Sequence, residues 1–316
     1  MRFGHKVLVE PITLEANKTK TLKLPQDRFI QSINLMCSVT FSNSTASAVS
    51  VTRNDWLNVI KRIQIVANGN DYLINVNGMR KYLVNKYLLG TNPYGVFPDS
   101  VPGNGGSATA EFEIPLIFAI NPSDPLDVSC PIPAHLTSSL FLIVDIGSAP
   151  SNLSLSGNIK VIVKEIYADA NEIRTLYGNR LQNLRKLYEI ELEKQITAVH
   201  SNYTFAVDLD VGSIIQKLGI FAYDANENLS DSIISEYRIK QESPIDLILE
   251  DITFKASKAE DKRRYKLESL EPGFTIYDAE FKTGGLDTRG MKTGDIKFLA
   301  NTTATGKVVL CHREIV

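Results

Sequence analysis

The chain carries one strand-like segment at its middle and again at its end. Residues 157–166 read Gly-Asn-Ile-Lys-Val-Ile-Val-Lys-Glu-Ile, and residues 306–315 read Gly-Lys-Val-Val-Leu-Cys-His-Arg-Glu-Ile. Aligned 149 residues apart, they match Gly157 with Gly306 and share the closing Glu-Ile. Both alternate with a period of two and are rich in β-branched residues, which predicts a strand in each. A strand that recurs in this way indicates a domain that is built twice.

Weaker matches between the two halves follow in the same order along the chain. They pair residues 9–13 with 192–197, 21–24 with 204–207, 30–33 with 215–218, 54–57 with 230–233, and 62–63 with 238–239. Their fixed order supports a duplicated unit whose second copy has shorter loops. We therefore expect a first domain at residues 1–166, a bridge at 167–183 with helical spacing, and a second domain at 184–316.

Short alternating runs separated by turn signals dominate both halves. Asn68-Gly69-Asn70 predicts a hairpin turn, because Asn-Gly tolerates the positive φ angles of such turns. Strands are expected at residues 54–65 and 126–131 among others, and short helices at 79–89 and 258–267. Helices do not alternate with strands, which disfavours a parallel α/β fold. The prediction is an all-β protein of two tandem jelly-roll β-sandwiches with a few short helices.

Residues 90–110 form the longest stretch without regular periodicity, and Gly and Pro crowd it. Loops of this length inside a compact domain are usually functional or mobile. Because Gly and Pro weaken strands, we expect the segment to stay outside the sheets, at one end of the first sandwich. Shortening it is then expected to leave the fold intact.

Composition excludes several function classes. The 316 residues carry a formal net charge of −2 with Lys and Arg spread along the chain, so the basic stripe of a nucleic-acid-binding surface is missing. No apolar run has the length of a transmembrane helix, and the first residues do not resemble a signal peptide. The three cysteines lie far apart, which favours buried free thiols over disulfides.

The sequence also offers no recognisable catalytic or cofactor motif. The four histidines are scattered, and the jelly-roll enzymes of the cupin kind need clustered metal ligands. Gly103-Asn104-Gly105-Gly106 is not followed by the Lys-Ser/Thr of a phosphate loop. Lys262-Arg263-Arg264 has acidic neighbours and is interpreted as a solvated helix face, and Trp56 as a core residue. We expect no enzyme activity, no cofactor and no metal.

Two strand-rich units, an intervening helix and one long Pro/Gly loop resemble the double jelly-roll major capsid proteins of the adenovirus-hexon lineage. That family includes the coats of tailless, membrane-containing phages and archaeal viruses. The resemblance covers nearly the whole chain and rests on organisation and size. It implies homotrimers that act as pseudo-hexameric blocks of an icosahedral shell, located in the virion and assembled in the host cytoplasm.

The resemblance also implies partners and a site. The partners would be further copies of the chain, vertex or minor capsid proteins, and an internal membrane beneath the shell, with no specific nucleic acid. Residues 90–110 would form a tower or intersubunit loop. Its candidate contact residues are Asn92, Pro93, Tyr94, Phe97, Pro98, Pro102 and Asn104.

Two other functions are consistent with the same residues. A tandem β-sandwich could be a glycan- or receptor-binding module, as in a spike or adhesin, and more weakly a jelly-roll enzyme. An obligate trimer would favour the coat protein, whereas a monomer would favour the binding module.

Overall fold

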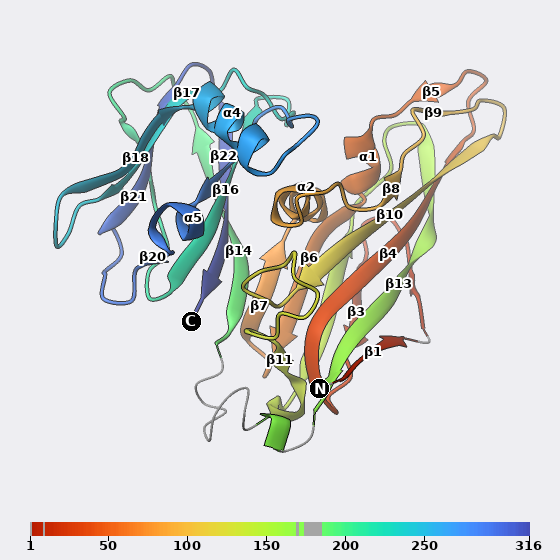
Figure 1. Cartoon of the computed structure of the whole chain (residues 1–316). Coiled ribbons are helices and arrows are strands. Elements are labelled where there is room, and N and C mark those ends of the chain that lie inside the picture. The colour runs from red at the N-terminus through yellow and green to blue at the C-terminus, as the bar shows by residue number, and fades with distance from the viewer. Residues whose placement is uncertain (1, 9, 169–170, 174–184) are drawn as a thin grey trace. The chain divides into compact units, whose positions relative to one another are not determined.

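The computed structural model describes residues 2–8, 10–168, 171–173 and 185–316. It divides into two compact units, Met1–Leu187 and Tyr188–Val316 (Figure 1). Most of the expected bridge at residues 167–183, with Arg174 and Arg180, lies outside the described residues. The bounds of the two domains and the bridge therefore stay a prediction. No helix in the described ranges is long and apolar enough to cross a membrane.

The first sheet of unit 1 is built around two long antiparallel strands, β4 and β13. Its order is β1-β13-β4-β10-β8, and β2 also pairs with β13 (Figure 1). The strands are β1 (Arg2–Val7), β2 (Ile12–Thr13), β4 (Phe29–Asn43), β8 (Gly95–Val96), β10 (Ser107–Ile117) and β13 (Leu153–Tyr167). Alternate residues of β4, from Ile33 to Phe41, are buried. This period-two burial gives the sheet one face toward the sandwich core.

The second sheet of unit 1 has the order β7-β6-β12-β3. Its strands are β3 (Thr19–Lys23), β6 (Ile60–Ala67), β7 (Asp71–Val76) and β12 (Leu140–Ile146). Asn68 and Gly69 have φ angles of 53° and 85° between β6 and β7, which confirms the predicted hairpin turn. Two further short strands, β5 (Val49–Ser50) and β9 (Ser100–Val101), pair with each other.

Two predicted strands of unit 1 were wrong. Residues 54–65 begin as helix α1 (Arg53–Leu57), because Thr52 and Asp55 form a capping box, and only then enter β6. Residues 126–131 form turns, in which the side chains of Asp124 and Asp127 accept backbone N–H groups. A short strand, β11 (Ile132–Pro133), and the 3-10 helix η1 (Ala134–Leu136) follow.

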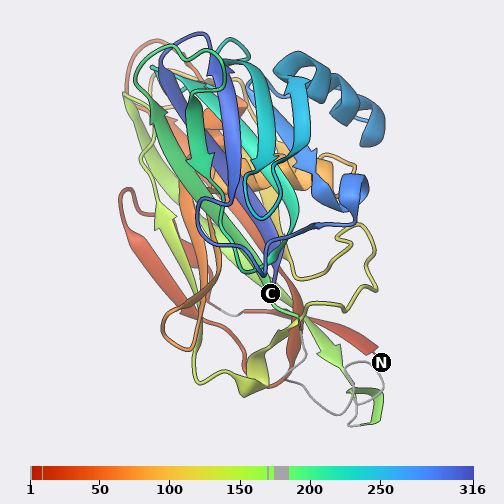
Figure 2. The same ribbon diagram turned by 90° about the vertical axis from the view of Figure 1, so that its left-hand side faces the viewer.

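Unit 2 repeats the two-sheet arrangement. One sheet has the order β14-β22-β16-β19, with β20 beside β16, and the other has the order β15-β21-β17-β18. Figure 2 shows the second of these sheets toward the viewer, with helix α4 at its margin. The strands are β14 (Leu187–Ile196), β15 (Phe205–Asp208), β16 (Ile214–Asp224), β17 (Ile234–Gln241), β18 (Leu247–Thr253), β19 (Phe274–Asp278), β20 (Leu286–Asp287), β21 (Ile296–Thr302) and β22 (Gly306–Ile315).

The order of strands is the same in both units. Taking β1 and β2 together as the first, unit 1 has eight main strands, and so does unit 2. In each unit the first, eighth, third and sixth strands form one sheet, and the second, seventh, fourth and fifth form the other. This crossing pattern of two Greek keys is a jelly roll. The predicted fold of two tandem jelly rolls is confirmed.

The register of the paired strands bears out the sequence repeat in detail. Where β13 pairs with β4, the register shifts at Lys164-Glu165, and Gln31 is the extra residue of a β-bulge. Where β22 pairs with β16, it shifts opposite Arg313-Glu314, and Gln216 is the extra residue. Both glutamines are buried. The matches at 149 and 185 residues therefore connect structurally equivalent positions.

Helices follow the fifth strand in both units, as the sequence predicted. Helix α2 (Gly78–Leu88) follows β7, and α4 (Phe254–Arg264) follows β18. A short helix that the sequence analysis did not predict, α5 (Ala279–Thr283), follows β19.

The segment 90–110 departs from the expectation that it stays outside the sheets. Val96 and Gly95 pair with Glu111 and Phe112, so β8 extends the edge of the first sheet. The prolines flank β8 at positions 93 and 98 and do not interrupt its hydrogen bonds. That placement is compatible with an edge strand.

Candidate functional site

Three of the seven candidate loop residues pack onto unit 1. The Tyr82 hydroxyl donates a hydrogen bond to the Pro93 carbonyl oxygen at 2.9 Å, and the Trp56 indole N–H donates to that of Pro98 at 2.8 Å. The Phe97 ring stacks on Phe112 with centroids 5.5 Å apart and meets Tyr82 edge-on at 5.9 Å. Trp56 is fully buried against Phe41, which confirms that it is a core residue.

The other four candidate residues are exposed, and they are Asn92, Tyr94, Pro102 and Asn104. Tyr94 and its neighbour Val96 are 48% and 56% exposed. The Tyr94 backbone N–H donates a hydrogen bond to the Glu113 carboxylate at 3.3 Å, and the Tyr94 hydroxyl donates to the Glu111 carboxylate at 3.4 Å. We call Tyr94, Val96, Glu111 and Glu113 the β8–β10 edge. Tyr94, Val96 and Glu111 are exposed and Glu113 is half-buried, so the surface is both apolar and acidic.

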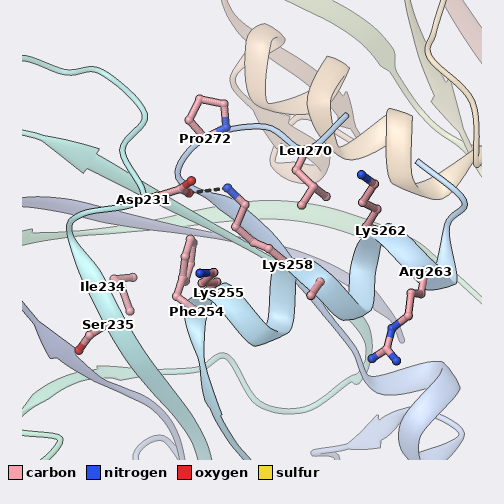
Figure 3. Close-up of a pocket in the computed structure, with 11 residues that line it drawn as sticks. Asp231, Ile234, Ser235, Phe254, Lys255, Lys258, Lys262, Arg263, Leu270 and Pro272 are labelled. Atoms are coloured by element: carbon pink, nitrogen blue, oxygen red, sulfur yellow. Dashed lines mark hydrogen bonds and ion pairs between the residues drawn. The ribbon is translucent and has the colours of Figure 1, made fainter. Parts of the chain in front are cut away.

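Unit 2 carries an open groove of about 800 Å³ beside α4 (Figure 3). Helix α4, the start of β17 and the residues before β19 form its walls. The lining residues are Asp231, Ile234, Ser235, Phe254, Lys255, Lys258, Ala259, Lys262, Arg263, Leu270 and Pro272. We call this surface the α4 groove. Phe254 and Ile234 lie almost fully buried at the bottom of the groove, and Ala259, Leu270 and Pro272 supply its more accessible apolar surface.

An ion pair fixes one wall of the groove to the other. The Lys258 ammonium bonds to the Asp231 carboxylate across the groove (Figure 3), and the Gly273 backbone N–H donates to the same carboxylate at 2.7 Å. Lys258 is 7% exposed, whereas the Asp231 side chain is 56% exposed, so the contact joins a buried ammonium to a carboxylate at the surface. The groove is therefore held in shape in the isolated chain.

Buried hydrogen bonds anchor α4 on the sandwich. The Asp261 carboxylate accepts from the Thr275 hydroxyl at 2.6 Å and from the Ile276 backbone N–H at 3.0 Å. Burial raises the pKa of Asp261 to about 6, although both hydrogen bonds act to lower it. Ser257 links Thr275 to the Tyr237 hydroxyl. These contacts make α4 a fixed element.

Three cations of α4 that line the groove, Lys255, Lys262 and Arg263, form no ion pair with a carboxylate of the described residues. Lys255 and Lys262 are exposed. They lie seven residues apart, two turns along one face of the helix, on either side of Lys258. The predicted solvated face is found at Lys262 and Arg263, whereas Arg264 lies near Asp278 and Glu260.

The histidines do not converge on a site. Among residues 2–8, 10–168, 171–173 and 185–316, no group of three His, Cys, Asp or Glu side chains could hold a metal ion. His135 lies edge-on to Phe29, and His200 contacts the Thr204 hydroxyl at 3.2 Å. His312 is fully buried, and burial lowers its pKa to about 4. The three cysteines are free and buried, as predicted.

Comparison with known proteins gives matches at the level of structure. No family model and no curated protein matches the sequence. The crystal structure of the major capsid protein of STIV is similar, with a TM-score of 0.86, 18% identity, and coverage of 100% of this chain and 97% of that one. A chain in the atomic structure of Sulfolobus turreted icosahedral virus gives a TM-score of 0.89, 18% identity, and coverage of 100% and 91%.

A third similar structure is that of the major capsid protein P2 of bacteriophage PM2. Its TM-score is 0.61 at 10% identity, with coverage of 99% of this chain and 97% of that one. At such identities the similarity establishes the fold. The chain is a double jelly roll like these capsid proteins, which confirms the resemblance inferred from the sequence.

Proposed function

We propose that this protein is a major capsid protein, whose trimers act as pseudo-hexameric blocks of an icosahedral shell. The observation that carries the proposal is the match of two jelly rolls in one chain to the STIV major capsid protein over 100% of the sequence. It favours the coat protein over a glycan-binding or receptor-binding module.

The fold suits such a role physically. Three chains around a threefold axis would place six similar sandwiches in a ring, and such six-sided blocks pack side by side into a continuous surface. Closed cyclic symmetry is the common outcome for homo-oligomers. An obligate trimer of this size is expected to bury well over ~1,600 Å² of surface in total.

The proposal extends to partners and location. The protein would reside in the virion, assemble in the host cytoplasm, and contact vertex or minor proteins and an internal membrane. The residues Asn92, Pro93, Tyr94, Phe97, Pro98, Pro102 and Asn104 would belong to a tower or intersubunit segment. The exposed Tyr94 supports this assignment, and the packing of Phe97 on Phe112 supports a structural role within it.

Light scattering of the purified wild-type chain at micromolar concentration tests the proposal. The expected species has three times the mass of one chain, and electron microscopy at higher concentration should show hexagonally packed blocks. A stable monomer that binds a glycan in an ordered way would contradict the coat protein and support the binding module. Charge reversal at Arg174 and Arg180, in the predicted bridge, is expected to weaken association while leaving each sandwich folded.

A further inference from the structure

Helices α2 and α4 occupy equivalent positions in the two sandwiches. Their N-caps, Asn77 and Thr253, lie 176 residues apart, the same separation as the sequence matches at the fourth strand. Each cap side chain accepts a backbone N–H from the first turn of its helix. By this register Lys258 corresponds to Tyr82.

The chain itself covers this position in unit 1. Tyr82 donates its hydroxyl hydrogen to Pro93 and contacts the ring of Phe97. The connection that supplies these residues spans 89–106, between α2 and β10. In unit 2 the corresponding connection, residues 265–273, is half as long. The equivalent face of α4 is open and forms the α4 groove.

The groove and the β8–β10 edge are chemically complementary. The groove has an apolar surface at Ala259, Leu270 and Pro272 above the buried Phe254 and Ile234. Beside it lie Lys255 and Lys262, which form no ion pair with a carboxylate of the described residues. The β8–β10 edge presents apolar Tyr94 and Val96 with acidic Glu111 beside them. Among the described residues of its own unit, each surface is accessible, because the groove is open and both apolar side chains are about half exposed. Opposite charges at the rim of an apolar contact favour specific association.

We propose that the α4 groove of one chain binds the β8–β10 edge of a second copy. In this contact Tyr94 and Val96 lie on the apolar surface of the groove, and Lys255 and Lys262 face Glu111 and Glu113. The inference rests on the proposed function, because it assigns a surface to the self-association that a coat protein needs. The two surfaces belong to different parts of the chain, so the contact is heterologous and can close into a ring.

A charge-reversal series tests the contact. The variant Lys255→Glu/Lys262→Glu is expected to weaken trimer formation at least about tenfold, measured by sedimentation at several concentrations. Lys255→Glu places an acid in the first turn of α4, which favours the helix, and Lys262→Glu places one in the last turn, which disfavours it, so the two effects on helix stability offset each other. The matched control is Lys61→Glu/Lys292→Glu, which changes the net charge equally at two exposed lysines outside both surfaces. It should assemble like the wild type.

Adding Glu111→Lys to the groove variant should restore association, because each chain then carries the reversed pair. The inference is overturned if the groove variant assembles as well as the wild type, or if Glu111→Lys fails to restore its assembly. In both cases the wild type still trimerises and the proposed function stands. A wild-type chain that stays monomeric contradicts the proposed function, and this inference with it.

Discussion

Gly157 and Gly306 occupy the same place in their two sandwiches. A Cβ atom on Gly157 would lie 2.1 Å from the backbone oxygen of Ser38 on the adjacent strand, and a Cβ on Gly306 would lie 2.0 Å from that of Tyr223. Both contacts are far shorter than any real Cβ contact. The glycine that opens each repeat is therefore required by the close approach of two strands.

We expect Gly157→Ala and Gly306→Ala to destabilise their own units by about 1–3 kcal/mol each, because the backbone must shift to admit the methyl group. Chemical denaturation measures the loss of unfolding free energy, and hydrogen exchange identifies which unit is destabilised. Gly105→Ala is the control, since its φ of 79° is positive but nothing lies near the added Cβ. A Gly157 variant that costs no more than the control would show that the close contact is absent.

The buried His312 should make unit 2 sensitive to acid. It lies opposite Leu218 on the strand face that carries Val308 and Leu310 into the core. Its pKa falls from about 6.5 in the unfolded chain to about 4 when folded, because burial disfavours the charged ring. The folded state therefore loses about 3 kcal/mol as pH falls from 6.5 to 4.

Replacement of the ring removes this part of the pH dependence. In urea titrations, the free energy of unfolding of His312→Leu should fall by about 3 kcal/mol less than that of the wild type between pH 6.5 and 4. Equal losses in the two proteins would mean that His312 is protonated without cost in the folded state.

The ion pair of Arg313 with Glu189 is buried on both sides, each residue being 2% exposed. Arg313→Met should cost about 3–5 kcal/mol, because it leaves the Glu189 carboxylate buried without its cation. The double variant Arg313→Met/Glu189→Met should recover most of that loss. A double-mutant cycle in guanidinium measures the coupling, and additive effects would contradict it.

Residues 93–98 should stabilise unit 1, contrary to the expectation from sequence. Phe97→Ala removes a ring that packs on Phe112 and Tyr82 and should cost about 2 kcal/mol. Tyr94→Ala, three residues before Phe97 in the sequence but at a side chain that is 48% exposed, should change the stability of the monomer by less than about 0.5 kcal/mol. If Phe97→Ala and Tyr94→Ala had equal effects on thermal unfolding, residues 93–98 would not stabilise unit 1 and could be shortened as the sequence predicted.

The matched segments and the strand alternation together predicted the duplicated jelly rolls, because burial on one sheet face imposes period two on strands such as β4 and β12. Strand β19 is buried at every position and shows no alternation. The helix at Arg53–Leu57 was missed although Thr52 and Asp55 form a recognisable capping box. The turns at 126–131 were missed because Asp124 and Asp127 supply acceptors that a strand neighbour would otherwise supply.

The α4 groove could not be predicted in the same way. Lys262 looked like any solvated helix residue, and its neighbour Leu270 like any loop residue. The groove exists because the short connection at residues 265–273 leaves one face of α4 uncovered. This becomes visible only when the folds of the two units are compared. The packing of Pro93 and Phe97 on Tyr82 was likewise hidden, because loop composition alone does not say where a segment docks.

The unequal connections after α2 and α4 make the contact surfaces of the two units different. Six identical sandwiches could meet their neighbours in only one kind of contact, repeated around the ring. In this chain the longer connection of unit 1 covers helix α2, whereas the shorter connection of unit 2 leaves one face of α4 open to contact with a neighbouring chain. In the proposed contact the two unequal units would therefore give each chain two different contact surfaces, and all chains of a ring would have to be arranged in the same sense.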